Sequence, residues 1–413
     1  SDLAKERLTY NAIQSIVDTV TARVGETKPR PFYLTSAGDY RQQRKAKKLN
    51  QYIEGVFYDQ KTYDVGLQAF RDAAIWGDGF IHVFGRGGKV VHERVMPGEL
   101  WVDEIEGQYG FPRRMHRLKV VDREELCTYF PEARAQIEKA SRALEVTSSV
   151  QANISDMVTV VESWNLASPN ADGEMVGGKH AITLISQSYM LVEPEDYPYD
   201  HFPFAHVPWC PRPVGFWSQG LAEQLQGQQL ELNKTLWLIQ RSMHLAGSFK
   251  ILLQNGSKVV KEALNNEVGA VITYTGAPPQ YISPEPINPE YLSHAQKILE
   301  RMYMMAGVSE LAAKSSKPAG LNSGKAIREF EDVESERFRT IQRQNDNLYL
   351  DIADLTKEVA KELAKEGRMV PMRVPNSRNF SVIDFKKDIG MFDDDAFVRQ
   401  CFPVSRLPKD PAG

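Results

Sequence analysis

The stretch from residue 323 to residue 366 constrains the fold more than any other part of this chain. It contains no proline, and its single glycine, Gly324, stands at the very start. Apolar side chains recur every three or four residues, and only Glu334 and Asn345 interrupt this series. The spacing predicts a helix with one buried stripe. The stripe runs through Ile327, Phe330, Glu334, Phe338, Ile341, Asn345, Leu348, Ile352, Leu355, Val359 and Leu363. One such helix would extend roughly 66 Å, several times the length of an average helix. We therefore expect a long rod against which other elements pack.

A helix, a β-rich insert and a second helix precede this rod. Residues 218–247 predict a helix of about thirty residues, with a stripe formed by Leu221, Leu225, Leu232, Leu236 and Ile239. Its other faces are unusually neutral, with six glutamines between positions 219 and 240. The second predicted helix, 289–308, opens near Pro289 and closes at Gly307. A small, polar linker over 309–322 then leads into the rod.

The first two hundred residues mix helices and strands. Helical periodicity runs over 1–24, 39–57 and 61–76, and the third helix closes at Gly77 and Gly79. Alternating residues around the GRGG sequence at 85–88 then predict a β-hairpin. Further strands follow over LWVDEI and FPRRMHRLKVV, with a short helix from Asp122 to about Ala143, and then DMVTVVESWNLA and HAITLISQSYMLV. After the rod, FSVIDFKKDIG and DAFVRQCFPVSRLP return to strand-like patterns, so the fold class is α+β.

Composition excludes several classes of protein. The chain has 413 residues, 25% of them charged, and a net charge of −4. Such a balance excludes a protein that coats nucleic acid by bulk positive charge. Three widely separated cysteines without CxxC spacing argue against a disulfide framework or zinc ribbon and favour a reducing compartment. No apolar run reaches the ~18 residues of a transmembrane helix, and the start lacks a signal-peptide layout, so we expect no membrane association and a cytosolic origin.

The sequence contains no catalytic constellation. GLNSGKA at 320–326 resembles a phosphate-binding loop, but three residues separate its glycines where four are needed, and Ala326 follows the lysine where Ser or Thr is needed. A helix start at Ser323 and Gly324 is the better interpretation. The GRGG turn is explained by the hairpin, with phosphate binding as a weak alternative, and Asp393–Asp395 by a solvated loop. No HExxH or GxSxG motif occurs, and packing explains His201 and His206. We expect no catalytic residue, no metal site and no cofactor.

Lys314 and Lys317 lie in the predicted linker. Lysines on a flexible loop can contact phosphates without reading bases, which gives salt-sensitive, sequence-independent binding. The alternative is that these two lysines only keep the loop solvated. From their spacing alone, this alternative is favoured.

The order of the segments resembles that of tailed-bacteriophage portal proteins. GFWSQGLAEQLQGQQLELNKTLWLIQ at 215–240 looks like the family's entry into the stem, and NGSKVV, ITYTGAPP, INPE, AGVSELAA and SGKAIREFE match the run that follows. Upstream, WGDGFIHV and VMPGELWVDEIEG resemble the wing, and FPVSRLPKDPAG resembles the turn before the crown. No single motif is diagnostic, but their order is, and it covers most of the chain.

The resemblance implies a portal fold with a mixed α/β wing, a two-helix stem, a small β-rich clip and a very long helix next to a tunnel loop. Its implied divisions run in chain order: wing 1–217, first stem helix 218–247, clip 248–288, second stem helix 289–308, tunnel loop 309–322, long helix 323–367 and a return to the wing over 368–413. The helical crown of the family is expected to be absent or truncated.

The function that the resemblance implies is mechanical. Twelve copies of the chain would form a ring at one capsid vertex. Double-stranded DNA would be packaged and ejected through this ring. Implied partners are the major capsid protein, the large subunit of the terminase and, later, a head-completion or tail adaptor, with assembly in the host bacterial cytoplasm and a final place in the virion. Twelve copies at −4 would give about −48, so the wall would largely repel DNA and let it slide.

Three groups of residues are the expected contact sites. Lys314, Lys317 and Asn322 of the tunnel loop would face the DNA channel. Lys234 and Arg241, seven residues apart on one helical face, would be stem charges facing either the lumen or a neighbour. Lys258, Lys261, Asn265 and Asn266 of the clip would face the terminase and adaptor.

The alternatives are another structural ring component of the head–tail connector and, less favoured, a packaging ATPase or nuclease. The defective glycine loop predicts no nucleotide turnover, and a connector protein would generally be shorter and lack the stem–clip–stem order. A generic helical scaffold would not explain a β insert between two helices.

Overall fold

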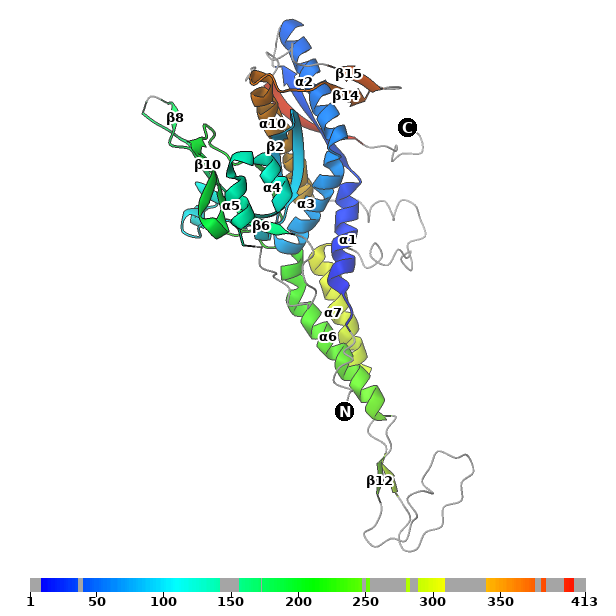
Figure 1. Ribbon diagram of the computed structural model, residues 1–413. Helices are drawn as coiled ribbons and strands as arrows, with labels where there is room; N and C mark the ends of the chain where they lie inside the picture. Colours follow the sequence, from blue (N-terminus) through cyan, green and yellow to red (C-terminus); the bar gives the residue numbers. More distant parts are fainter. Residues whose placement is uncertain are drawn as a thin grey trace. The chain divides into compact units, whose positions relative to one another are not determined.

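The computed structural model describes residues 9–35, 40–141, 156–171, 173–246, 250–252, 280–282, 289–308, 339–375, 380–383 and 397–404. Chain contacts divide the protein into two compact units. Unit 1 comprises Ser1–Ile16 and Leu225–Ala319, and unit 2 comprises Val17–Gln224 and Gly320–Gly413. Figure 1 shows the elements of both.

The described residues form helices and antiparallel sheets, which confirms a mixed α+β protein. The helices are α1 (Ala12–Gly25), α2 (Tyr40–Asp59), α3 (Thr62–Trp76), α4 (Arg123–Tyr129), α5 (Arg134–Lys139), α6 (Leu221–Ala246), α7 (Pro289–Ala306) and α10 (Arg339–Lys365). The 3-10 turns are η2 (Pro97–Glu99), η3 (Glu106–Tyr109), η4 (Pro131–Ala133) and η5 (Ile185–Gln187).

The longest sheet has the order β10–β9–β6–β5–β4, and a three-stranded sheet has the order β11–β2–β3. Two-stranded sheets pair β1 with β16, β12 with β13, β14 with β15 and β7 with β8. The strands are β1 (Lys28–Thr35), β2 (Asp78–Arg86), β3 (Lys89–Val95), β4 (Leu100–Trp101), β5 (Arg114–Asp122), β6 (Met157–Asn165), β7 (Ser168–Pro169), β8 (Met175–Val176), β9 (Lys179–Leu184), β10 (Tyr189–Asp196), β11 (Phe204–Pro208), β12 (Lys250–Leu252), β13 (Gln280–Ile282), β14 (Met372–Pro375), β15 (Phe380–Ile383) and β16 (Phe397–Val404).

The centre of unit 2 is the three-stranded sheet, whose two faces pack against different partners. The alternation of a strand sends successive side chains to opposite faces. One face carries His92, which lies between Thr62 of α3 and Thr356 of α10 and bonds to both hydroxyls, at 2.8 and 2.9 Å. The other face carries Phe80 and His82 and packs against the longest sheet through a shared apolar core of Phe80, Val95, Leu100, Met115, Trp164 and Phe204. The result is a layer of helices, a small sheet and a larger sheet.

The hairpin and the end of α3 follow the sequence prediction closely. Strands β2 and β3 pair from Phe80–Val95 to Arg86–Lys89, and the turn falls at Gly87 and Gly88, both with positive φ. Helix α3 ends at Trp76, and Gly77 (φ 106°) follows it. Gly79 is different from what was expected: it belongs to β2, because the turn of the chain is completed at Gly77.

One predicted helix is wrong in extent. The stretch from Asp122 was expected to be a single helix, but it divides into α4 and α5 around η4. Pro131 lacks the N–H that a continuous helix needs, and it therefore separates the two short helices. Both still bury one side in a satellite core with Val158, Val160 and Leu184.

The long helices agree with the predicted patterns wherever the structure describes them. In α6, Leu221, Leu225, Leu232 and Ile239 are buried, whereas Leu236 is only partly so. Helix α7 starts at Pro289 and is followed by Gly307 with φ 70°. Helix α10 confirms the predicted rod from residue 339 to 365. Residues 323–338 lie outside the described residues, as do the helix start at Ser323 and Gly324 and the acidic run 393–395.

Helix α10 buries its stripe, including the polar Asn345, at 4% exposure. Leu348 and Ile352 have no exposed surface. The helix packs on β11 and β2, and also on β1 and β16. The strands predicted after the long helix are found as β15 and β16. Strand β14 was not anticipated.

Candidate functional site

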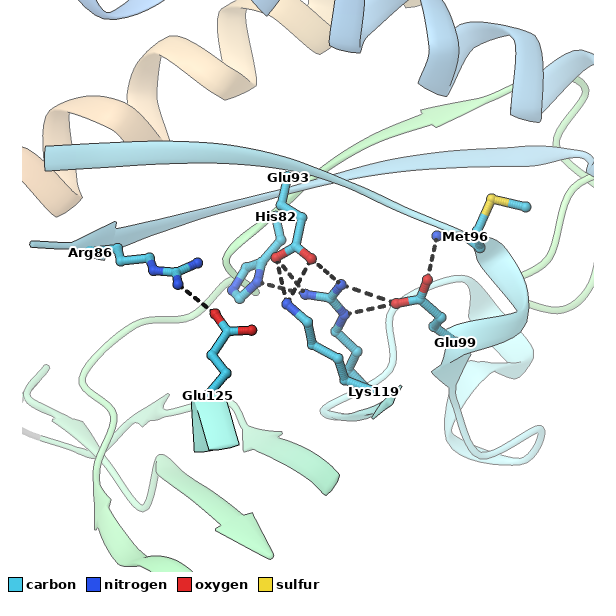
Figure 2. Close-up of polar contacts among 8 residues, drawn as sticks. His82, Arg86, Glu93, Met96, Glu99, Lys119 and Glu125 are labelled. Atoms are coloured by element: carbon cyan, nitrogen blue, oxygen red, sulfur yellow. Dashed lines mark hydrogen bonds and ion pairs between the residues drawn. The ribbon is translucent and has the colours of Figure 1, made fainter. Parts of the chain in front are cut away.

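A partly buried charge cluster lies where the two sheets of unit 2 meet, and the buried Arg117 of β5 is its centre. The Arg117 side chain is only 2% exposed. Its guanidinium donates to Glu99 from Nε and Nη2, at 3.1 and 3.0 Å, and to Glu93 from Nη1 and Nη2, at 3.4 and 3.2 Å. Lys119, two residues along β5, donates to both oxygens of Glu93 at 2.7 and 2.8 Å. Figure 2 shows these side chains converging from β2, β3, η2 and β5.

The cluster is balanced in charge and leaves its histidine neutral. Two cations face two carboxylates, which is the condition under which charges can be buried without a large penalty. Arg117 Nη1 lies 3.1 Å from His82 Nδ1, and because a guanidinium can only donate, Nδ1 must accept. Desolvation lowers the pKa of His82 to about 3, which agrees with that assignment. Burial opposes ionisation of Glu93, but hydrogen bonds from Lys119 and the charge of Arg117 bring its pKa below the usual value.

This geometry suits a structural joint and not acid–base chemistry. The donors of Arg117 and the Nδ1 of His82 are already engaged, and the lowered pKa of His82 keeps this histidine neutral near neutral pH. Glu99 also accepts from the backbone N–H of Met96 and so fixes the turn between β3 and β4. The cluster therefore locks η2 and the small sheet onto the larger one.

A second polar joint holds the start of α6. The Asp78 side chain, 1% exposed, accepts from the backbone N–H of Ser218 at 2.7 Å and pairs with His206 Nε2 at 2.8 Å. Gly77 lies against the same turn, and a Cβ added there would come within 2.2 Å of the Ser218 carbonyl oxygen. Glycine is required here both by this contact and by its positive φ. The segment that enters α6 is thereby fixed to the end of α3 and the start of β2.

A cavity of about 650 Å³ borders α10 in unit 2. Its lining combines aromatic rings, among them Phe111 and Phe204, with the α10 carboxylates Asp351, Asp354 and Glu358. His201 pairs with Glu358 through Nε2 at 2.8 Å and with Asp200 through Nδ1 at 2.9 Å. The hydrogen bond to Glu358 is the main reason that the pKa of His201 rises to about 9. Burial raises the pKa of Asp351.

Packing was expected to explain His201 and His206, but it does not account fully for either residue. His206 does stack on Phe80, with ring centroids 4.5 Å apart, but it also pairs with buried Asp78. His201 is an ion-pair partner of two carboxylates. The reason is tertiary: Asp78 and Glu358 come from distant parts of the chain.

In unit 1, α6 and α1 are joined by side-chain amides. Gln229 Oε1 accepts from the first N–H groups of α1, those of Ala12 and Ile13, at 3.0 and 3.2 Å. Asn233 Oδ1 accepts from the N–H of Tyr10 at 3.1 Å. The start of a helix leaves such N–H groups without partners, so α6 supplies the cap of α1. Two of the polar residues on α6 thus have a structural use.

The predicted stem charges Lys234 and Arg241 lie on α6. Lys234 Nζ is 3.9 Å from Glu231, one turn before it, and the Lys234 side chain is 69% exposed. The Arg241 guanidinium lies over the Trp237 ring at 5.4 Å. Both contacts are within the helix. The other predicted contact residues, Lys314, Lys317 and Asn322 and also Lys258, Lys261, Asn265 and Asn266, lie outside the described residues.

The sequence reasoning missed Arg117 and Asp78. One signal was available for Arg117: in β5 it shares the buried phase with Met115, so a charged residue occupied a position that alternation assigns to the core. No local signal marked Asp78, whose partners lie 128 and 140 residues away.

The described residues contain no group of three or more His, Cys, Asp or Glu side chains arranged to hold a metal ion. Cys127, Cys210 and Cys401 are free thiols. Within the same ranges, no helix combines the length and apolarity needed to cross a bilayer.

Comparison with known proteins gives one match. A family model described as "Phage P22-like portal protein" matches residues 2–335, well over half of the chain. A search of curated proteins found no match.

Proposed function

The chain belongs to the phage P22-like portal protein family, and from that premise we propose that its copies close into a ring of twelve at one capsid vertex. Double-stranded DNA would enter the capsid through the ring during packaging and leave through it on infection. Membership of the family makes the chain a structural component of a phage particle. The observation that carries the proposal is the extent of the family match, which covers α1 through α7 without interruption.

We assign the portal parts as the order of elements suggests. The proposed wing is 1–217 together with 368–413, the stem helices are 218–247 and 289–308, and the clip is 248–288. The tunnel loop would be 309–322 and the long helix 323–367. Two features support this division: α6 and α7 flank an antiparallel pair, β12 with β13, and α10 is 27 residues long.

The charge of α6 and α7 suits a conduit. Helix α6 carries Glu223 and Glu231 against Lys234 and Arg241, and α7 carries two acids and two bases as well, so both are formally neutral. Binding to duplex DNA depends on the number of phosphates that cations neutralise. A neutral wall makes few such contacts and lets the duplex slide. Lys314 and Lys317 of the tunnel loop would add a few contacts to the phosphate backbone of the DNA, and Asn322 would lie beside them.

Exposed apolar side chains provide surfaces for a neighbouring copy. In the segment between β4 and β5, Ile105, Tyr109 and Phe111 are each more than 80% exposed. In unit 1, Leu230 and Met243 of α6 and Met304 of α7 are 62–66% exposed. Large apolar side chains that stay exposed in a subunit are candidates for contact with a partner. A ring needs a heterologous interface that closes on itself, and we assign these surfaces to contacts between copies.

The proposed docking partners meet the clip. Lys258, Lys261, Asn265 and Asn266 would contact the terminase large subunit during packaging and a head-completion or tail adaptor afterwards. The major capsid protein would surround the ring at the vertex. None of these roles requires a catalytic group in this chain.

Negative-stain images of the purified, assembled protein test the proposal directly. We expect end-on views with a central hole and about twelvefold symmetry. A photocrosslinking residue placed at 314 or 317 should then attach to DNA held in the channel, and one placed at exposed Tyr129 of α4 should not. Compact closed particles without a hole would contradict a channel, and crosslinks only from position 129 would contradict the tunnel-loop assignment.

A further inference from the structure

The first turns of α2 hold the densest cluster of positive charge in the described chain. Five cations occur within eight residues of this helix: Arg41, Arg44, Lys45, Lys47 and Lys48. The first acidic residue after them is Glu54, more than three turns into the helix. The chain as a whole has a net charge of −4, so this cluster opposes the general balance of the protein.

The cluster is placed where helix electrostatics disfavour it. Backbone dipoles give the start of a helix a partial positive charge, which favours acids there. The first turn of α2 contains none. Arg41, Arg44, Lys45 and Lys48 also follow one another at three- and four-residue spacing, so they lie on one face and repel each other. Neither the helix dipole nor this spacing favours the arrangement, which suits the binding of an external anion.

Three of these cations are available to such an anion. Arg41, Arg44 and Lys47 are exposed, and none of them forms an ion pair within the described residues. Lys45 and Lys48 take part in interactions of their own. Glu54, which lines the same surface groove as Lys47, is already paired with Arg30.

The second half of α2 is packed in a way that leaves its first turns apart. Around Gly55 the helix meets β14 so closely that an added Cβ would lie 2.9 Å from the Met372 sulfur. Tyr52, Ile53 and Val56 are buried. In the first two turns only Ala46 is buried, and Tyr40 is 80% exposed.

We propose that this basic face of α2 binds the phosphate backbone of duplex DNA, as a contact separate from the channel helices. The proposal rests on the proposed function in one respect, since a portal ring works in the presence of DNA. Arginine and lysine are the usual partners of phosphate, and such contacts carry no sequence preference. A protein partner would call for an apolar centre, and lysine is depleted from the cores of protein interfaces. Tyr40 is the one large apolar side chain exposed on these described turns.

The test compares two variants with the same change in charge. One is Arg41→Gln, Arg44→Gln, Lys47→Gln, and the control is Lys61→Gln, Lys139→Gln, Arg343→Gln, which removes three exposed cations from other elements. Covalently closed circular duplex DNA is the probe, because it cannot thread a closed ring. Binding is measured by filter retention over a series of salt concentrations.

The wild type and the control should bind the circle at about 50 mM salt, and the α2 variant should bind at least tenfold more weakly. Its slope of log K against log salt should be less steep by about 2.7, which is ~0.9 for each of three lost phosphate contacts. Equal binding by the two variants, no binding by the wild type, or retention of polyglutamate in preference to DNA would overturn the proposal. Negative-stain images of the wild type separate this failure from that of the proposed function, because intact wild-type rings that do not bind the circle overturn only the contact at α2.

Discussion

The carboxylate of Asp78 accepts a hydrogen bond from the backbone N–H of Ser218, 2.7 Å away across 140 residues of sequence. This bond ties the first residue of β2 to the turn that enters α6. His206 approaches the other oxygen of the same carboxylate, so one buried acid serves two partners.

Replacing Asp78 by alanine should therefore destabilise the subunit. The buried N–H of Ser218 and the partly exposed ring of His206 lose their partner, and we expect the free energy of unfolding to fall by about 2–4 kcal/mol. Denaturant unfolding of the dissociated subunit measures it. Asp196→Ala is the control, because the Asp196 side chain in its pair with Lys179 is 91% exposed and its removal should leave the unfolding free energy nearly unchanged. Equal losses in the two variants would contradict the role of Asp78.

The Arg117 cluster predicts non-additive effects. Arg117→Met leaves Glu99 without its buried cation, and we expect a loss of about 3–5 kcal/mol in unfolding free energy. In a Glu99→Gln background the same change should cost less, because the stranded charge is gone. A double-mutant cycle by chemical denaturation measures the coupling. The exposed pair of Arg134 and Glu138 supplies a matched cycle, in which the coupling should be much smaller than at Arg117. Additivity at Arg117 would refute the cluster as a joint.

His92 makes stability fall in mild acid. Desolvation lowers its pKa to about 3 in the folded state, whereas an unfolded histidine has a pKa near 6.5. The contribution is thus complete above pH 6.5 and is lost as the pH falls toward 3, at up to about 1.4 kcal/mol per pH unit. His92→Gln should show a shallower decline than the wild type between pH 6.5 and 4.5 in pH-dependent unfolding. His82 titrates in the same range and stays in place in both proteins, so parallel declines would contradict the prediction.

His201 acts in the opposite direction. Its pKa is raised to about 9 by Glu358 and Asp200, above the unfolded value of 6.5. The stabilisation is fully present below pH 6.5 and is lost as the pH rises through 9. The His201 side chain is 41% exposed, so the effect is discounted to about 1 kcal/mol. The melting temperature of His201→Gln should lie below that of the wild type at pH 6 and approach it at pH 10. A constant difference would show that His201 contributes by packing alone.

The segment between β4 and β5 should affect assembly more than folding. Tyr109→Ser with Phe111→Ser removes two rings that are 82% and 86% exposed, so the unfolding of the subunit should change by less than about 0.5 kcal/mol. Loss of apolar contact should shift mass photometry from rings toward single subunits. The control pair, Val176→Ser with Met190→Ser, alters exposed apolar residues of β8 and β10 and should leave the rings intact. Unaltered rings in the first variant would remove this segment from the interface.

The periodic parts of the fold were predictable because they are local. The stripe of α6, the proline and glycine that bound α7, and the hairpin at Gly87 and Gly88 each depend on residues a few positions apart. Likewise, Leu348, Ile352 and Leu355 of α10 are buried as their spacing predicts. The expected single helix from Asp122 is divided into α4 and α5. Pro131 lacks the N–H that a continuous helix needs, so the break could be predicted from this one residue.

By itself, the sequence determined the type and approximate bounds of the long elements, the class of the protein and, through the order of its segments, its family. Tertiary structure alone decided which polar residues are buried together. Arg117 meets Glu93 and Glu99 only because two separate sheets pack face to face, and Asp78 meets Ser218 only because α6 begins beside the end of α3. Periodicity acts over a few residues, whereas the burial of a charge depends on which distant groups arrive to compensate it.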